Sequence, residues 1–168
     1  MGGFGIVVMK LSKLLSVDQI ILDMKAEEPW TAITELVDHL VACQRLPNRQ
    51  REPILAALKT RENLVSTGIG SGVAIPHAFS DAIHEVVAIF GYSKAGLDFE
   101  ALDHAPVHFI LLFIVPRIDY QLHLKTLAAI AKMFTNGEIR RQLGAAKTRH
   151  DMLAIFDCKP SRVAPPGA

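Results

Sequence analysis

The sequence has few cysteines, little excess charge and no long hydrophobic run. Its 168 residues include two cysteines, Cys43 and Cys158, which lie far apart and in no metal-binding or redox spacing. They cannot form a disulfide framework, so a reducing cytoplasm is the expected location. Lysine and arginine total 18 against 17 acidic residues, which predicts no strongly basic surface of the kind that binds nucleic acid or anionic lipid.

Membrane insertion and export are not expected either. The longest apolar run, residues 107–116, has about half of the roughly 18 residues that a spanning helix needs. It is predicted to be a core strand, and any association with a membrane is expected to be peripheral. Residues 1–11 have too short an apolar stretch and no clear cleavage site for a signal peptide, and Ile6 stands where myristoylation requires serine or threonine.

The length fits one domain. We expect a flexible N-terminus at residues 1–10, with Met1 or Met9 as the native start, a domain at 11–157 and a disordered tail at 158–168.

Two helices are predicted in the first third of the chain. Apolar residues at helical spacing define one buried face: Ile33, Leu36, Val37, Leu40 and Val41. This pattern predicts a helix that starts at Pro29 and ends near Cys43. A second helix is expected from about Pro53, and it places Arg61 and Glu62 beside a glycine-rich segment.

The middle of the chain is predicted to form strands. Residues 86–92 and 107–116 are apolar runs rich in β-branched and aromatic side chains, typical of interior strands, with a turn-like connection at 93–106. Residues 19–24 are a candidate first strand. Residues 73–75 form a short buried run that Pro76 ends abruptly, so His77 is expected at a strand end.

Helical patterns return near the C-terminus. Asp119 is a plausible N-cap, and one face of the following helix is expected to carry Leu124, Leu127, Ala128 and Ala131 until Asn136-Gly137. Shorter helices follow, one ending at Gly144 and one opening with a Thr148-x-x-Asp151 capping box. The fold class is α/β, a mixed β-sheet flanked by helices on both faces.

The segment from Thr60 to Phe79 concentrates the residues with chemical potential. Its candidate phosphate loop consists of Ser66, Thr67, Gly68, Gly70, Ser71 and Gly72. Glycine alternation often marks only a tight turn, and no Gly-Lys-Ser/Thr follows, so a nucleotide P-loop is excluded. Nearby Arg61 and His77 favour phosphoryl transfer, because neutral imidazole is a nucleophile and fixed donors offset charge on phosphoryl oxygens.

Three other interpretations compete. A hydrolase with Ser66 as nucleophile lacks the Gly-x-Ser-x-Gly elbow. A metal site built from His84, His104 and His108 lacks a completing cysteine or carboxylate, so no metal or cofactor is expected. A binding module without chemistry would have no need to keep Arg61 and His77 together.

The same residues resemble a known family, the enzyme IIA domains of the bacterial phosphoenolpyruvate-dependent phosphotransferase system, of the mannitol and fructose class with its nitrogen-regulatory branch. The family signature is matched by Glu62, Ile69, Gly70 and the run Val73-Ala74-Ile75-Pro76-His77-Ala78. The resemblance extends from about Leu11 to Phe156. It departs from the usual pattern at Asp103-His104, where relatives carry Asp-Gly, and at Ala78, where many carry glycine.

The resemblance implies roles for three residues. His77 would accept a phosphoryl group from a histidine of the carrier HPr or its nitrogen-branch relative NPr, and Arg61 matches the family's arginine sixteen positions earlier. His123 stands forty-six positions after His77, where the family has its second active-site histidine; without the resemblance it is a capping or core-edge residue. Phe79 and Ile118 are expected to supply apolar surface around His77.

The resemblance also implies partners. Without a fused membrane segment or a cysteine-bearing acceptor domain in the sequence, the nitrogen branch is favoured. Its members bind targets such as potassium transporters and sensor kinases according to their phosphorylation state. The alternative is a sugar-specific enzyme IIA that passes the phosphoryl group to a cysteine of enzyme IIB.

Overall fold

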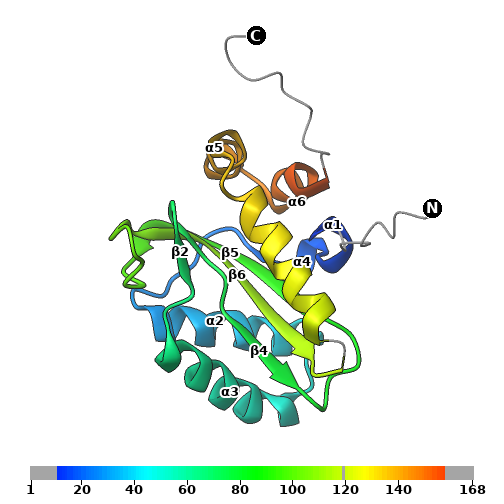
Figure 1. The fold of residues 1–168 in the computed structure, drawn as a ribbon. Helices are drawn as coiled ribbons and strands as arrows, with labels where there is room; N and C mark the ends of the chain where they lie inside the picture. The colour runs from blue at the N-terminus through cyan, green and yellow to red at the C-terminus, as the bar shows by residue number, and fades with distance from the viewer. Residues whose placement is uncertain (1–10, 119, 158–168) are drawn as a thin grey trace, which may run out of the picture.

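A computed structural model describes residues 11–118 and 120–157 as a mixed sheet with helices on both faces (Figure 1). The strands are β1 (Ile20–Ile21), β2 (Gly68–Gly70), β3 (Val73–Ala74), β4 (His77–Ser80), β5 (Val87–Leu97) and β6 (Val107–Pro116). The helices are α1 (Leu11–Leu14), α2 (Pro29–Ala42), α3 (Arg51–Leu64), α4 (Tyr120–Met133), α5 (Gly137–Ala145) and α6 (Arg149–Asp157), with 3-10 turns η1 (Val17–Gln19) and η2 (Asn48–Gln50). Three predictions lie outside the described residues: the flexible N-terminus at 1–10, the disordered tail at 158–168 and the N-cap at Asp119.

Strand β6 is the centre of the sheet. The strand order is β1-β5-β6-β3-β2, and β4 also pairs with β6. β6 runs antiparallel to β5 and parallel to both β3 and β4. A strand that is covered on both faces can be continuously apolar, which explains the uninterrupted run in β6. Its side chains alternate between two separate cores, so that Ile110 lies in one and Phe109 in the other.

The two cores confirm the predicted α/β sandwich. One core joins the sheet to α2 and α3, with Leu36, Leu58 and Ile110 fully buried. The other joins it to α1, α4, α5 and α6 and contains an aromatic group in which Phe90 meets Phe156 edge-on at 5.0 Å. Burying one such large apolar side chain contributes about 1.5–3 kcal/mol, so both layers hold the sheet firmly.

The first two helices agree with the sequence patterns. α2 begins at Pro29 and ends at Ala42, with Cys43 as its C-cap. α3 begins at Arg51 rather than near Pro53 and carries Arg61 in its last turn, as predicted. At the start of α6 the capping box is also confirmed, because Thr148 Oγ1 accepts the Asp151 N–H at 3.0 Å while the Asp151 carboxylate accepts the Thr148 N–H at 3.2 Å.

Helix α4 differs from its prediction. Leu127 is buried as expected, but Leu124 and Ala128 are exposed, and the core contacts come instead from Ile130 and from Phe134 just beyond the helix. α4 ends at Met133, and Asn136 caps α5 by accepting the Glu138 N–H at 2.9 Å. The predicted face is therefore partly right, since Leu127 is in the core and Ala131 packs against it, and it is displaced because apolar residues occur on two sides of the helix.

Strand β5 is longer than predicted. It continues through residues 93–97, which the sequence pattern placed in a turn. The register with β6 shifts between Tyr92 and Leu97, and Gly96 has φ +84°, so a bulge absorbs the irregular residues and Leu97 still pairs with Val107. Within the described residues, no helix combines the length and apolar character needed to cross a membrane.

Candidate functional site

His77 is the first residue of β4, and the strand before it is interrupted at Pro76. β3 and β4 pair with β6 in one continuous register, in which Val73 faces Phe109 and His77 faces Phe113. Proline has no N–H for the ladder, although the Pro76 carbonyl still accepts the Phe113 N–H at 3.0 Å. The predicted strand end before Pro76 is confirmed, because β3 ends at Ala74, and the structure adds that His77 opens the next strand, whose pairing with β6 fixes its position on the sheet.

The orientation of the His77 ring distinguishes its two nitrogens. Nδ1 lies 2.9 Å from the Ile75 carbonyl oxygen, which can only accept, so Nδ1 carries the proton and donates it. The proton on Nδ1 leaves the lone pair of a neutral ring on Nε2. The Phe79 ring meets the imidazole edge-on, with 6.3 Å between the ring centroids.

The surroundings of His77 favour the neutral imidazole. Burial lowers its pKa below the usual 6.5, and the positive charge of Arg61 lowers it further. The Ile75 carbonyl and the Glu62 carboxylate act in the opposite direction, and their effect does not reverse the shift. At neutral pH the ring is therefore uncharged, with its single proton on Nδ1 and a free lone pair on Nε2.

Arg61 and His77 share a cavity of about 220 Å³ under α4. Its lining comprises Arg61, Ser66, Thr67, Ile69, Ile75, His77, Leu127, Ala128 and Ala131. The Arg61 guanidinium donates through Nη1 to the Val65 carbonyl at 2.8 Å and forms no ion pair within residues 11–118 and 120–157. Its charge is thus available to an anion beside His77.

Ser66 and Thr67 line this cavity, but each of their hydroxyl groups already donates its proton to an acceptor within the protein. The Ser66 hydroxyl donates to the Phe99 carbonyl and accepts the Gly68 N–H at 3.1 Å. The Thr67 hydroxyl donates to the carboxylate of Glu62, which also accepts the Thr67 N–H at 3.3 Å. These contacts tie the end of α3 to β2 and position the cavity wall.

The glycine segment builds a turn at the far end of the β2–β3 hairpin. Gly70, Ser71 and Gly72 have φ of 92°, 57° and 80°, a region that glycine enters without strain. The Ser71 N–H donates to the Asp103 carboxylate at 2.8 Å. Val73 and His77 are four strand residues apart, or roughly 13 Å, so the turn lies further still from the imidazole. The structure does not bring these three residues to the His77 cavity.

His123 lies on the first turns of α4 and is half-buried. It lines a different, larger cavity together with Lys13 and His84. The start of α4 nevertheless reaches the His77 neighbourhood, because the Tyr120 ring meets Phe79 edge-on at 6.2 Å. Across residues 11–118 and 120–157, no cluster of three or more histidine, cysteine or acidic side chains could hold a metal ion, and His108 Nδ1 instead donates to the Ser93 carbonyl.

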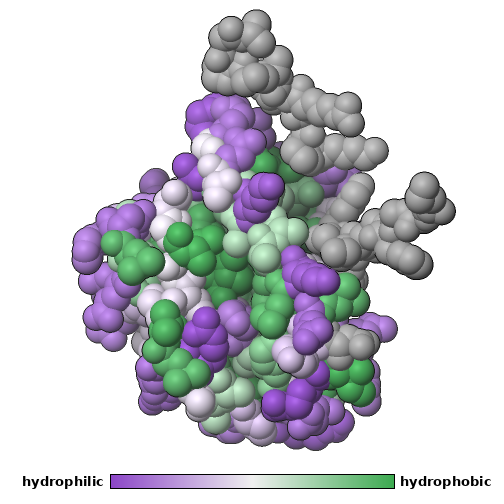
Figure 2. All heavy atoms as spheres, viewed as in Figure 1, coloured by the Kyte–Doolittle hydropathy of each residue, from purple (hydrophilic) through white to green (hydrophobic). Residues whose placement is uncertain are grey.

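Apolar side chains are exposed on the elements that surround the cavity. Figure 2 shows apolar surface between α4 and the strands β2 and β4. The large exposed apolar residues on these elements and their flanks are Leu64, Val65, Ile69, Ile118, Tyr120, Leu122 and Leu124. Sequence reasoning identified Ile118 but missed Leu64 and Val65, although two apolar residues directly after the polar run 59–63 were a visible signal.

Comparisons with known proteins agree on one family. A family model described as "Phosphoenolpyruvate-dependent sugar phosphotransferase system, EIIA 2" matches residues 13–158. The fructose-specific EIIABC component of Bacillus subtilis is 34% identical over 151 residues, covering 89% of this chain and 23% of that protein, so the chain spans less than a quarter of this relative. A nitrogen regulatory protein of Pseudomonas aeruginosa is 34% identical over 123 residues, 73% of this chain and 79% of that protein. The crystal structure of nitrogen regulatory protein IIA-Ntr from Neisseria meningitidis superposes with a TM-score of 0.79 at 28% identity, covering 87% of this chain and 98% of that one.

Proposed function

This chain belongs to the EIIA 2 family of the phosphoenolpyruvate-dependent sugar phosphotransferase system, and we propose that it carries a phosphoryl group on Nε2 of His77. The observation that carries the proposal is the His77 Nδ1 contact with the Ile75 carbonyl at 2.9 Å, because it directs the nucleophilic lone pair to Nε2. The donor would be the phosphohistidine of HPr or of its nitrogen-branch relative.

The transfer needs no proton movement at His77. The Nε2 lone pair attacks phosphorus, the bond from phosphorus to the carrier's ring nitrogen breaks, and its electron pair returns to that ring. The His77 ring gains positive character, which the Ile75 carbonyl stabilises by accepting the Nδ1 proton in a hydrogen bond. Arg61 would offset negative charge on the phosphoryl oxygens, since it shares the cavity and has no carboxylate partner among the described residues.

His123 is proposed as the second histidine of the site. The resemblance to the family supports this role, and so does its position one turn after Tyr120, which packs on Phe79 beside His77. A hydrogen bond from His123 to a phosphoryl oxygen would require its ring to turn from the larger cavity toward His77. The role is therefore one of orientation, while the covalent step belongs to His77.

Two physiological roles are possible, and they differ in which protein receives the phosphoryl group or responds to it. We propose a nitrogen-branch regulator whose phosphorylation state controls target binding, supported by relatives with that name over most of their length. The second candidate is a sugar-specific enzyme IIA, favoured by the equally identical fructose-specific relative. In both roles the exposed apolar side chains Leu64, Ile69 and Ile118 would contact the phosphoryl donor.

The proposal is tested with phosphoenolpyruvate, enzyme I and either phosphocarrier. Intact-protein mass measurement should show one acid-labile phosphate on the wild type and none on His77→Ala. His150→Ala removes an exposed histidine on α6 and serves as the matched control that should label normally. Labelling of His77→Ala equal to that of the wild type would refute the proposal.

A further inference from the structure

A second cavity of about 600 Å³ lies beside the one that contains His77. It is open to solvent on one side and is bordered by α1 and η1, by Arg45, by the segment entering β5, by the end of β6 and by the first turns of α4. Its lining consists of Lys13, Leu14, Leu15, Ser16, Gln19, Arg45, His84, Glu85, Val86, Val87, Pro116 and His123. We call this cavity the basin. Its volume falls within the range of small-molecule sites, about 300–1,000 Å³.

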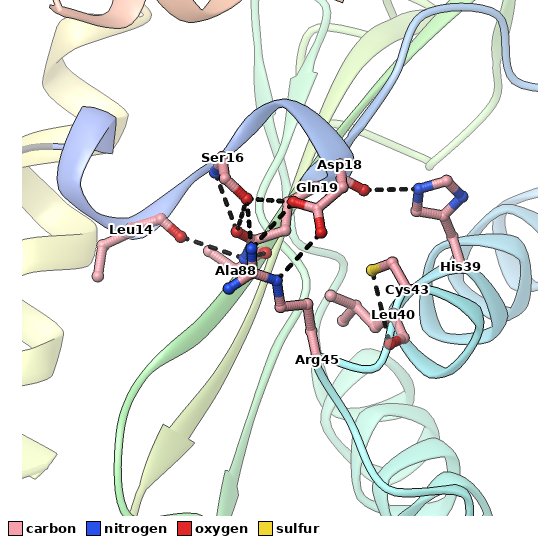
Figure 3. Close-up of polar contacts among 9 residues, drawn as sticks. All are labelled: Leu14, Ser16, Asp18, Gln19, His39, Leu40, Cys43, Arg45 and Ala88. Atoms are coloured by element: carbon pink, nitrogen blue, oxygen red, sulfur yellow. Dashed lines mark hydrogen bonds and ion pairs between the residues drawn. The ribbon is translucent and has the colours of Figure 1, made fainter.

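One wall of the basin is a hydrogen-bonded network with its groups already paired (Figure 3). Gln19 donates from Nε2 to the Leu14 and Ala88 carbonyls at 3.3 and 2.8 Å, and Arg45 donates to Ser16 Oγ at 2.8 Å and to Asp18 Oδ1 at 3.1 Å. Contacts from Ser16 and then from Arg45 lower the pKa of Asp18, so the pair stays ionised and its charges cancel. This wall is a rigid support.

The remaining charged and titratable groups of the basin are unpaired. Lys13, His84, Glu85 and His123 form no hydrogen bond or ion pair through their side chains with any residue that the structure describes. They come from three separate elements, and three of the four are basic. With the Arg45 and Asp18 charges cancelled, the charges of Lys13 and Glu85 oppose each other, and Lys13 and the two imidazoles supply the N–H donors that an oxyanion requires.

The other walls are apolar. Leu14, Leu15, Val86, Val87 and Pro116 supply hydrophobic surface next to the basic groups. Such a combination suits a ligand with an anionic head and an organic body, because the lysine and imidazole N–H groups donate to oxyanions while the body displaces water from the apolar walls. We propose that the basin is a second ligand site, which takes phosphate monoesters of sugar-phosphate to nucleotide size.

The basin and the His77 cavity share α4. His123 faces the basin, while Leu127, Ala128 and Ala131 line the cavity of His77. A ligand in the basin would therefore contact the helix that covers the phosphoryl acceptor. Binding itself does not involve His77, so the proposal stands or falls separately from the phosphoryl-carrier function.

Isothermal titration of the full chain with glucose 6-phosphate and with AMP tests the proposal. Glucose and adenosine test the need for the phosphate, and inorganic phosphate tests the need for the organic body. Lys13→Ala/His84→Ala removes two basic groups of the basin. Lys147→Ala/His150→Ala removes an exposed lysine and histidine outside it and is the matched control.

We expect saturable binding of at least one phosphate monoester and tighter binding than for its uncharged counterpart or for inorganic phosphate. Lys13→Ala/His84→Ala should weaken it about tenfold or more, and Glu85→Gln should tighten it roughly twofold to fivefold. The control and His77→Ala should bind like the wild type. Absence of saturable binding by both esters, or equal affinity of the wild type and Lys13→Ala/His84→Ala, would overturn the proposal.

Discussion

Arg61 is the residue whose charge the proposed transfer depends on most, after His77 itself. Its guanidinium offers paired donors in a fixed plane, whereas lysine offers a single point charge. Arg61→Lys should fold normally and accept the phosphoryl group about a hundredfold to a thousandfold more slowly, measured by rapid-quench transfer from the phosphorylated carrier. Arg51→Lys changes another arginine of α3, one that is paired with Asp38, and should transfer at the wild-type rate. An unchanged rate in Arg61→Lys would remove Arg61 from the site.

The lowered pKa of His77 leads to a second prediction. Because burial and Arg61 lower this pKa below 6.5, the neutral form of the ring persists as the pH falls through 6.5. Between pH 6.5 and the lower pKa of the folded state, the unfolded chain binds the proton more readily than the folded chain does. The free energy of unfolding therefore decreases as the pH falls through this range. An NMR titration of the His77 ring should show a midpoint below 6.5 that rises in Arg61→Gln. A midpoint at or above 6.5 in the wild type would contradict the site's electrostatics.

The contacts between the last turn of α3 and the residue before β2 hold Arg61 near His77. Thr67 is 4% exposed, and its hydroxyl and N–H both donate to Glu62 in the last turn of α3. Thr67→Val keeps the shape and removes the hydroxyl, so we expect a loss of about 1–3 kcal/mol in the free energy of unfolding, measured by chemical denaturation. Thr60→Val, at an exposed position of the same helix, should stay within about 0.5 kcal/mol. Equal stabilities of the two variants would show that the contacts of Thr67 with Glu62 contribute little to the free energy of unfolding.

Elements with one clear apolar period were predictable from the sequence. α2 has a single buried face and a proline at its start, and both features are visible without a structure. α4 has apolar residues on two sides, one facing the core and one facing the His77 cavity, and periodicity alone does not rank them. The extension of β5 to Leu97 depends on a bulge at Gly96, which only the pairing with β6 defines.

The site was predictable as a set of residue types and less so as a set of contacts. The position of Arg61 beside His77 follows from a helix that ends before a strand, and the structure places both in one cavity. Two of its hydrogen bonds depend on tertiary structure and could not be predicted: the Thr67 hydroxyl donates to Glu62, and the Ser71 N–H donates to Asp103. The basin brings together Lys13, His84 and His123 from distant segments, and no local pattern signals such a group.

For the whole molecule, the proposed phosphoryl transfer would act through a change in surface charge. The chain has a formal net charge of +1, and a phosphoryl group adds roughly 1.5 to 2 negative charges within an apolar surface. If the protein is a nitrogen-branch regulator, a pull-down with wild type, His77→Ala and His77→Asp should recover a target that prefers one charge state. Rapid dephosphorylation by a fructose- or mannitol-type enzyme IIB, with sugar phosphate formed, would establish the sugar-specific role instead.

The most direct test of the phosphoryl-carrier account is to identify the nitrogen that bears the phosphoryl group. The protein is labelled with ¹⁵N-histidine, phosphorylated through enzyme I and the carrier, and observed by NMR for coupling between phosphorus and ring nitrogens. Because Nδ1 of His77 donates to the Ile75 carbonyl, the account predicts coupling to Nε2 of His77 alone, and none in His77→Ala. Coupling to Nδ1 of His77, or to any other histidine of the wild type, would contradict it.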